Sequence, residues 1–348
     1  MITSLWLAVV LVCFLAYIVL DGYDLGVGVA SLLERDGEHR RRMLESVAVA
    51  WDGNETWLIL LGVALWSGFP LAFGTVLPHA YLPMTVVLFS LIVRGVSIEM
   101  ASQAPPGRRW TTAFGIASLL ASFGQGFALG TLTSALRVSN GAYAGSAFGA
   151  FGWFSALAGV TVTAGYTALG YAYTKQKSSG SLRETAGRRG LACTALTAAL
   201  LVAALFAIND TAARLDLSSP GRAFAFGGLL LFAAAGATTA MVTFLWSQRS
   251  SAADTLPIGG LVVATVSVIL ALAVARYPVL VPPDLTVEGA VGPHNTMVFI
   301  LVGIGLNMPL VVAYNVFAHR VFGGKLDTGR PLSEPPDGEN LARTGAHS

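Results

Sequence analysis

The chain has 348 residues, of which 54% are hydrophobic and 11% are charged, and its mean hydropathy is +0.67. Such a chain lacks the polar surface that a soluble domain needs, and it contains many apolar stretches long enough to cross a bilayer. Its formal net charge of +2 is too small to indicate nucleic-acid binding. The composition therefore predicts an all-α, polytopic integral membrane protein.

Nine apolar stretches are predicted to be transmembrane helices. They cover residues 4–33, 46–73, 79–100, 111–136, 147–173, 190–208, 222–246, 256–276 and 294–317. The first has no preceding Lys or Arg and no cleavage site of small residues, so we expect it to remain as a span. Charged loops after the first and fifth helices favour two four-helix halves plus a ninth helix. Residues 1–322 then form the transmembrane bundle domain, and residues 323–348, rich in Gly, Pro and charge, are predicted to be a disordered cytoplasmic tail.

The distribution of Lys and Arg predicts the orientation of the bundle. With the N-terminus outside, sixteen basic residues fall on the cytoplasmic side, Arg137, Arg214, Arg222 and Arg276 fall outside, and Arg94 lies within a span. Basic residues are enriched in the cytoplasmic loops of membrane proteins. We therefore expect the N-terminus outside and the C-terminus in the cytoplasm.

Small residues on the first helix predict close packing between helix backbones. Gly22, Gly26 and Ala30 recur at a spacing of four, which places them on one helix face. Cys13 and Cys193 both lie inside predicted spans. We expect them to pack as small apolar side chains rather than to form a disulfide or a metal site.

Four acidic residues lie inside the first two predicted spans. Asp21 and Asp24 belong to the run DGYDLGVG, and Asp52 and Glu55 belong to WDGNETWL. A rise of 1.5 Å per residue places all four about 12 to 20 Å below the cytoplasmic surface, where ionisable groups are costly and mark a functional site by default. Each pair has i, i+3 spacing, so two neighbouring helices can present a cluster of carboxyls that holds exchangeable protons.

A static role for these acids is the alternative. Arg94 on the third predicted span lies at a comparable depth, where pairing with Asp24 or Asp52 would neutralise the charges and lock three helices together. Asn54 is equally suited to an interhelical hydrogen bond, and Trp51 to packing or to anchoring at the membrane interface. Proton transfer and static pairing do not exclude each other.

The histidines do not suggest a haem site in this chain. His39, His319 and His347 fall in cytoplasmic loops or the tail, and His79 and His294 fall at the outer ends of helices. A haem ligand must reach into a buried pocket, usually with a partner that orients it. We therefore expect no cofactor and no metal to be bound directly, and a haem that works with this chain would belong to another subunit.

Three runs together resemble subunit II of the cytochrome bd family of quinol oxidases. They are DGYDLGVG, WDGNETWL and SLIVRGVSIEMAS, which match in residue identity, order and spacing. The resemblance implies a heterodimer of the bacterial plasma membrane in which a homologous subunit I carries haem b, haem d and the quinol-oxidising site. For this chain it implies two four-helix bundles plus one peripheral helix. It also implies quinol and lipid as partners of the complex, and leaves open a quinone on this chain and small accessory subunits.

The resemblance assigns roles residue by residue. Asp24 and Asp52 match two aspartates associated with the cytoplasmic proton pathway, Trp51 matches the tryptophan before the second of them, and Arg94 matches an arginine on the third helix. Glu55 stands where other members can carry glutamine. The expected function is a subunit of a terminal oxidase that couples quinol oxidation to the reduction of dioxygen to water. In it, this chain stabilises subunit I and contributes to the proton pathway.

Two other functions compete with this one. A stand-alone proton-coupled secondary transporter would use the buried acids as coupling sites, but such transporters break helices in two corresponding places. Pro70, Pro78 and Pro83 flank one outer loop, and the second half has no matching pair. A purely structural assembly subunit would use its acids only to pair with Arg94.

Overall fold

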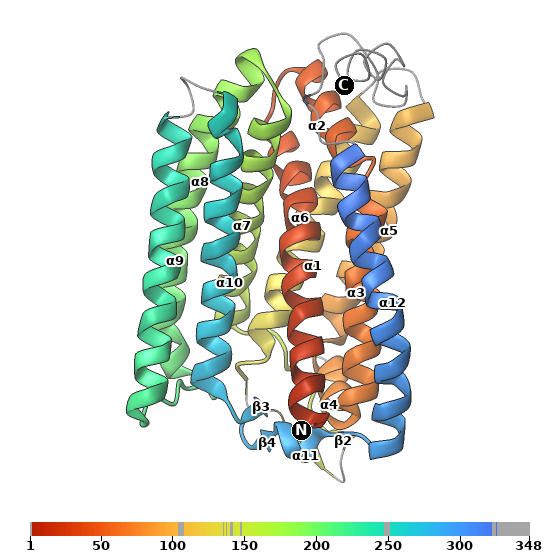
Figure 1. The fold of residues 1–348 in the computed structure, drawn as a ribbon, viewed down its shortest axis with the longest axis vertical. Coiled ribbons are helices and arrows are strands. Elements are labelled where there is room, and N and C mark those ends of the chain that lie inside the picture. Colours follow the sequence, from red (N-terminus) through yellow and green to blue (C-terminus); the bar gives the residue numbers. More distant parts are fainter. Residues whose placement is uncertain are drawn as a thin grey trace, which may run out of the picture.

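The fold comes from a computed structural model that describes residues 2–103, 108–134, 136, 138–139, 142–146, 148–246, 251–321 and 325. Long helices run between the two ends of the molecule (Figure 1). In chain order they are α1 (Ile2–Leu32), α3 (Trp51–Gly68), α5 (Tyr81–Gln103), α6 (Arg108–Thr131), α7 (Trp153–Lys177), α8 (Gly180–Ala207), α9 (Pro220–Trp246), α10 (Leu256–Arg276) and α12 (His294–Val321).

Seven of the described helices are long and apolar enough to cross a membrane, by length and composition. They correspond to α1, α5, α6, α8, α9, α10 and α12, so the prediction of an all-helical membrane bundle is confirmed. Helix α3 carries Asp52, Asn54 and Glu55 in its first two turns, and α7 is rich in Gly, Thr and Tyr, which lowers the hydropathy of both. The predicted number of nine spans is therefore not confirmed by hydropathy, although α3 and α7 lie in the same bundle.

Two predicted boundaries are wrong. The stretch 46–73 is not one helix, because Phe69 has left the helical region (φ −132°, ψ 60°) and Pro70 begins the separate helix α4 (Pro70–His79). A residue that precedes proline is disfavoured in the α conformation. Helix α8 begins ten residues before the predicted start at 190. Lys175 and Lys177, expected in a loop, lie instead in the last turn of α7 with buried side chains.

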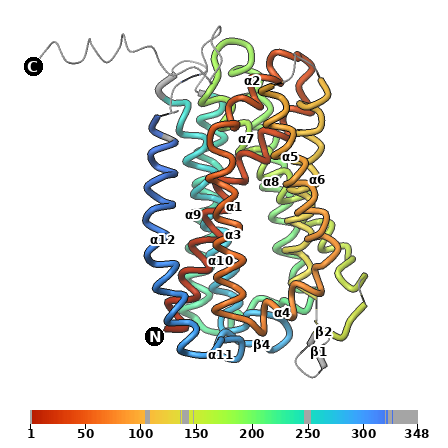
Figure 2. The backbone as a smooth tube through the Cα atoms, turned by 90° about the vertical axis from the view of Figure 1, so that its right-hand side faces the viewer, coloured from red at the N-terminus to blue at the C-terminus, as the bar shows by residue number. Residues whose placement is uncertain are grey.

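Short elements lie at the two ends of the bundle. Two short hairpins and one short helix lie at the end where α1 begins. They are β1 (Val138–Ser139) with β2 (Ala142–Tyr143), β3 (Val279–Val281) with β4 (Leu285–Thr286), and α11 (Val287–Ala290). Figure 2 labels β1, β2, β4 and α11 there. Two 3-10 turns, Ile208–Asp210 and Ser251–Thr255, follow α8 and precede α10.

A short helix that the sequence analysis did not anticipate, α2 (Gly37–Val47), links α1 to α3. Asp36 caps it, because its carboxylate accepts hydrogen bonds from the backbone N–H groups of His39 and Glu38 at 3.1 and 2.8 Å. These bonds hold the pKa of Asp36 below its usual range. The helix buries Met43 against the bundle, so it fixes where α3 starts relative to the end of α1.

Helix α1 packs against α7 with their backbones in contact. A side-chain carbon at Gly26 would overlap the backbone carbonyl of Tyr166, and one at Gly170 would overlap the backbone of Gly26. A carbon at Gly22 would press on the Tyr166 ring. The predicted close approach of helices at the small residues of α1 is therefore confirmed, and α7 is the partner.

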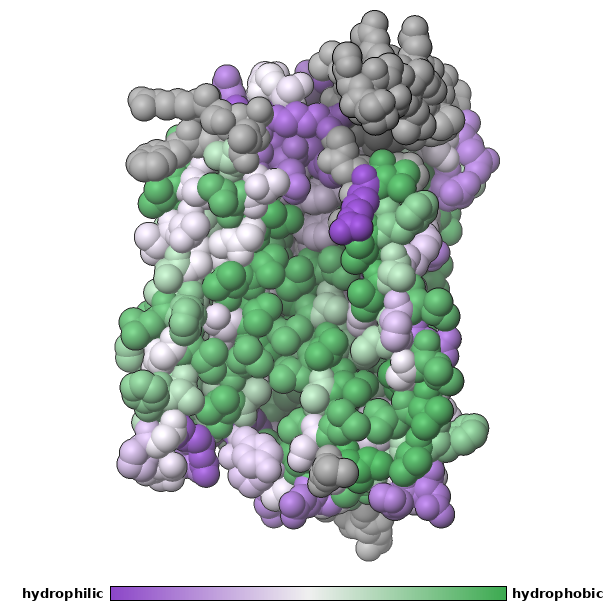
Figure 3. Space-filling model, viewed as in Figure 1, coloured by the Kyte–Doolittle hydropathy of each residue, from purple (hydrophilic) through white to green (hydrophobic). Residues whose placement is uncertain are grey.

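The surface has a broad apolar belt between two polar ends (Figure 3). The predicted tail at 323–348 lies outside the described residues, apart from Lys325. Cys13 and Cys193 are free thiols. We call the end of the bundle at which α1 ends the basic end, because it gathers Arg35, Arg40, Arg41, Arg42, Arg108, Arg109, Lys175, Lys177, Arg183, Arg188 and Arg189.

Replacing Gly26 with alanine should destabilise the protein, because the added methyl group meets backbone atoms of α7, which cannot turn away as a flexible side chain would. Overpacking of this kind costs about 1 to 3 kcal/mol or more. Gly62→Ala is the matched control, since nothing lies within 4 Å of a carbon added there. Thermal unfolding of the detergent-solubilised protein should show a lower midpoint for Gly26→Ala than for Gly62→Ala. Equal midpoints would contradict the close contact.

Candidate functional site

The guanidinium of Arg94 lies at the centre of the polar cluster inside the bundle. Its side chain is fully buried on α5, with Nη1 2.6 Å from Oδ1 of Asp21 on α1 and Nη2 3.3 Å from Oε2 of Glu55 on α3. The expectation that Arg94 would pair with Asp24 or Asp52 is wrong. Asp24 is turned toward Asn54, and Asp52 lies on the exposed side of α3.

The carboxyl of Asp24 is held by an amide instead of a cation. Nδ2 of Asn54 donates one hydrogen bond to Oδ2 of Asp24 at 2.9 Å and another to the hydroxyl of Tyr23 at 2.7 Å. Asp24 and Asn54 are buried, with at most 1% of each residue exposed. The helices α1 and α3 are therefore joined at this level by one side-chain amide.

The cluster contains more carboxyls than cations. Asp21, Asp24 and Glu55 face a single guanidinium, and Arg94 contacts only two of them at ion-pair distance within the described part of the chain. Oδ2 of Asp21 and Oδ1 of Asp24 are buried without a hydrogen-bond partner there. Carboxylate oxygens are costly to bury without partners, and the cluster leaves two of them so.

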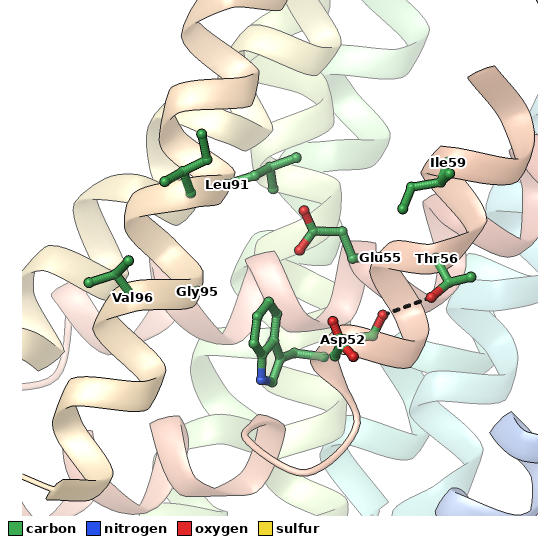
Figure 4. Close-up of a pocket in the computed structure, with 9 residues that line it drawn as sticks. Asp52, Glu55, Thr56, Ile59, Leu91, Gly95 and Val96 are labelled. Carbon is green, nitrogen blue, oxygen red and sulfur yellow. Dashed lines mark hydrogen bonds between the residues drawn. The ribbon is translucent and has the colours of Figure 1, made fainter. Parts of the chain in front are cut away.

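A cleft of about 380 Å³ opens beside the cluster, between α3 and α5. Figure 4 shows the Glu55 carboxyl extending into it from α3, opposite Leu91 on α5, with Asp52 one turn nearer the start of α3. The Glu55 side chain is 25% exposed, whereas the Arg94 side chain behind it is fully buried. Glu55 therefore connects the cleft with the buried guanidinium.

The indole of Trp51 fixes the spacing of α3 and α5 at this point. It packs on Gly95, where an added side-chain carbon would lie 2.9 Å from the ring. The guanidinium carbon of Arg94 lies 5.9 Å from the Trp51 ring centroid, within range of a cation–π interaction. Trp51 thus serves both as packing, one of the roles anticipated for it, and as support for Arg94.

Two groups of side chains in or next to the site were missed in the sequence. The Tyr23 and Tyr173 rings stack with centroids 4.4 Å apart, and the Tyr23 hydroxyl accepts a hydrogen bond from Asn54. One turn before Asp21, the Tyr17 hydroxyl accepts a hydrogen bond from Gln125 at 2.6 Å. Tyr23 stands inside the DGYD run and could have been noticed there. Tyr173 and Gln125 have no local signal, because only the fold brings α7 and α6 to α1.

The histidines that the structure describes lie near the ends of the bundle helices. His79 ends α4, and its Nδ1 lies 2.9 Å from the Tyr143 hydroxyl of the β1–β2 hairpin. His79 is buried at this end of the bundle. His294 is exposed at the start of α12, and His39 lies on α2.

Comparison with known proteins gives consistent matches. The Escherichia coli K12 protein named cytochrome bd-I ubiquinol oxidase subunit 2 is 30% identical over 187 residues, which is 51% of this chain and 49% of that one. The Bacillus subtilis protein named cytochrome bd ubiquinol oxidase subunit 2 is 32% identical over 134 residues, or 38% and 39% of the two chains. The matched region thus spans about half or less of the length of these relatives.

A solved structure shares the fold. A chain of the bd oxidase structure from Geobacillus thermodenitrificans superposes with a TM-score of 0.70 over 92% of this chain and 98% of that one, at 15% sequence identity. The sequence model described as cytochrome bd terminal oxidase subunit II matches residues 2–322. The resemblance found in the three N-terminal runs is therefore confirmed, and this multi-span membrane chain belongs to the cytochrome bd terminal oxidase subunit II family.

Proposed function

We propose that this chain is the subunit of a membrane oxidase complex that stabilises a haem-bearing subunit I and carries protons from the cytoplasm toward it. The complex would oxidise a quinol and reduce dioxygen to water. The haem groups belong in the partner, since the described histidines lie at the ends of this bundle.

The main support for a proton route is the buried Asp24 carboxyl. Arg94 is occupied by Asp21 and Glu55, so Asp24 lacks an ion-pair partner among the described residues. An unpaired carboxyl in a low-dielectric site is more stable with a proton bound. It can then release and regain that proton as the charge around it changes, which is what a proton carrier must do.

The cleft supports both the entry of protons and the presence of a partner. Asp52 and Glu55 line it, yet its rim is apolar, with Ile59 65% and Ile92 62% exposed. Carboxyls that faced lipid at this level would be costly, and polar residues in membranes almost always face protein or water. We therefore expect subunit I to cover the α3–α5 face and to receive protons from Asp52 and Glu55.

A purely structural role is the second candidate, and the pairing of Arg94 favours it. A buried guanidinium held by α1 and α3 locks three helices together without any proton transfer. The transporter alternative gains no support from the family to which the chain belongs. The two remaining roles assign different functions to Asp24, so they can be separated by mutation.

Asp24→Asn and Asp52→Asn should give complexes that assemble and keep their haem but lose most quinol oxidase turnover. Asparagine keeps the size of aspartate but does not exchange a proton near neutral pH, and loss of general acid–base transfer typically costs about 10² to 10⁴ in rate. The measurement is oxygen consumption per haem in purified complex. Normal turnover in both variants would refute the proton route.

Asp21→Asn is the matched comparison, because it removes a carboxylate that pairs with Arg94. Breaking a buried ion pair costs about 3 to 5 kcal/mol, so assembly should fall here while it survives in Asp24→Asn. If Asp24→Asn instead abolishes assembly as Asp21→Asn does, the structural role alone explains the acids.

The orientation gives a further test. The basic end should face the cytoplasm, so a reporter fused after Lys325 should read as cytoplasmic and one inserted at Ser139 as external. Paired reporter activities, such as alkaline phosphatase against a fluorescent protein, measure this. The reverse pattern would place the Asp24 cluster near the outer surface and exclude uptake from the cytoplasm.

Removing His79 or His294 should leave the haem content of the assembled complex near normal. His79 packs against Tyr143 and His294 is exposed, so neither is placed to ligate haem within this chain. Pyridine haemochrome spectra of His79→Gln and His294→Ala complexes test this. Selective loss of one haem from a stable complex would make this chain a ligand donor.

A further inference from the structure

The Tyr23 and Tyr173 rings form a stacked pair that joins α1 to α7 beside Asp24. Their centroids are 4.4 Å apart with an interplanar angle of 17°. The Tyr173 hydroxyl donates to the backbone carbonyl of Ser46 on α2 at 3.0 Å. The Lys177 ammonium lies 5.7 Å from the centroid of the Tyr173 ring. The pair is thus fixed from α1, α2 and α7 at once.

The Tyr23 hydroxyl of this pair is one of two acceptors for the Asn54 amide. A side-chain amide has two N–H groups, and both are used here, one on the Tyr23 hydroxyl at 2.7 Å and one on Oδ2 of Asp24 at 2.9 Å. Without the Tyr23 oxygen, only the bond to Asp24 would hold the amide. Rotation of the amide by half a turn would then present its oxygen to the carboxyl.

The orientation makes the two oxygens of Asp24 unequal. Oδ2 accepts from Asn54, whereas Oδ1 is buried with no hydrogen-bond partner in the described part of the chain. The oxygen of Asn54 is likewise buried without a partner there. A proton on Asp24 is therefore favoured on Oδ1, since Oδ2 already receives a donor.

We propose that Tyr23 and Tyr173 are positioning residues for the proton of Asp24. The hydrogen bond to the Tyr23 hydroxyl holds the Asn54 side chain so that its N–H group points at Oδ2 of Asp24. Oδ1 of Asp24 is then the oxygen that binds and releases the proton. The inference rests on the proposed proton-carrying role of Asp24. The other ionisable groups around Asp24 are Asp21 on the same helix, Glu55 on α3 and Arg94 on α5, and none of them hydrogen-bonds to Asp24 within the described residues.

The test combines turnover with infrared difference spectra of the assembled complex. Asp24→Asn removes the C=O stretching band of the protonated Asp24 carboxyl and so identifies that band. Tyr23→Phe keeps the stacked ring but removes the hydroxyl that accepts from Asn54. We expect it to shift the band and to lower turnover about fivefold to tenfold, the effect of one hydrogen bond. Tyr171→Phe is the control. Tyr171 lies on α7 two residues before Tyr173, is buried like Tyr23 and Tyr173, and makes no hydrogen bond to Asn54 or Asp24.

Tyr173→Phe gives a second, milder test if Tyr23→Phe fails to assemble. It retains the ring and loses only the bond to Ser46, so the band should shift in the same direction by a smaller amount. An unshifted band and normal turnover in both tyrosine variants would overturn the inference, even if Asp24→Asn is inactive. Normal turnover in Asp24→Asn would instead refute the proton-carrying role itself, which separates the two failures.

Discussion

A single buried guanidinium determines how the first helices of this protein are arranged. Arg94 is fully buried, and α1 and α3 each bring a carboxylate within ion-pair distance of its guanidinium. That pairing fixes the rotation of both helices about their axes. Once Asp21 and Glu55 face Arg94, the i, i+3 spacing places Asp24 against Asn54 and leaves Asp52 at the cleft. The geometry of the whole cluster follows from one charge.

The glycine contact between α1 and α7 makes this arrangement compatible with a tight bundle. Helices whose backbones touch at Gly26 and Gly170 bring Tyr173 over Tyr23, although the two tyrosines are far apart in sequence. Larger residues at the contact would move α7 outward and separate the rings. The small residues of α1 therefore contribute to the polar site as well as to packing.

The sequence was sufficient for those features that depend on short-range spacing. Helical class and the family were readable from composition and from three runs in the first third of the chain. The partners of Arg94 were not, because four carboxyls were predicted at similar depth and only helix rotation decides among them. The break at Phe69 was missed because apolar residues continue through it, and α2 was missed because its eleven residues are mostly polar. Tyr173 could not be assigned at all, since its role exists only where α7 meets α1.

The order of the charged groups along the chain bears on how the protein enters the membrane. An arginine at the centre of a nascent span opposes insertion by roughly 2.5 to 3.5 kcal/mol. Both carboxylates that neutralise Arg94 lie on α1 and α3, which are synthesised before α5. Helix α5, which carries the positive charge, therefore leaves the ribosome after the two helices that carry its counter-ions. In the reverse order, the cell would have to hold an uncompensated cation in lipid during translation.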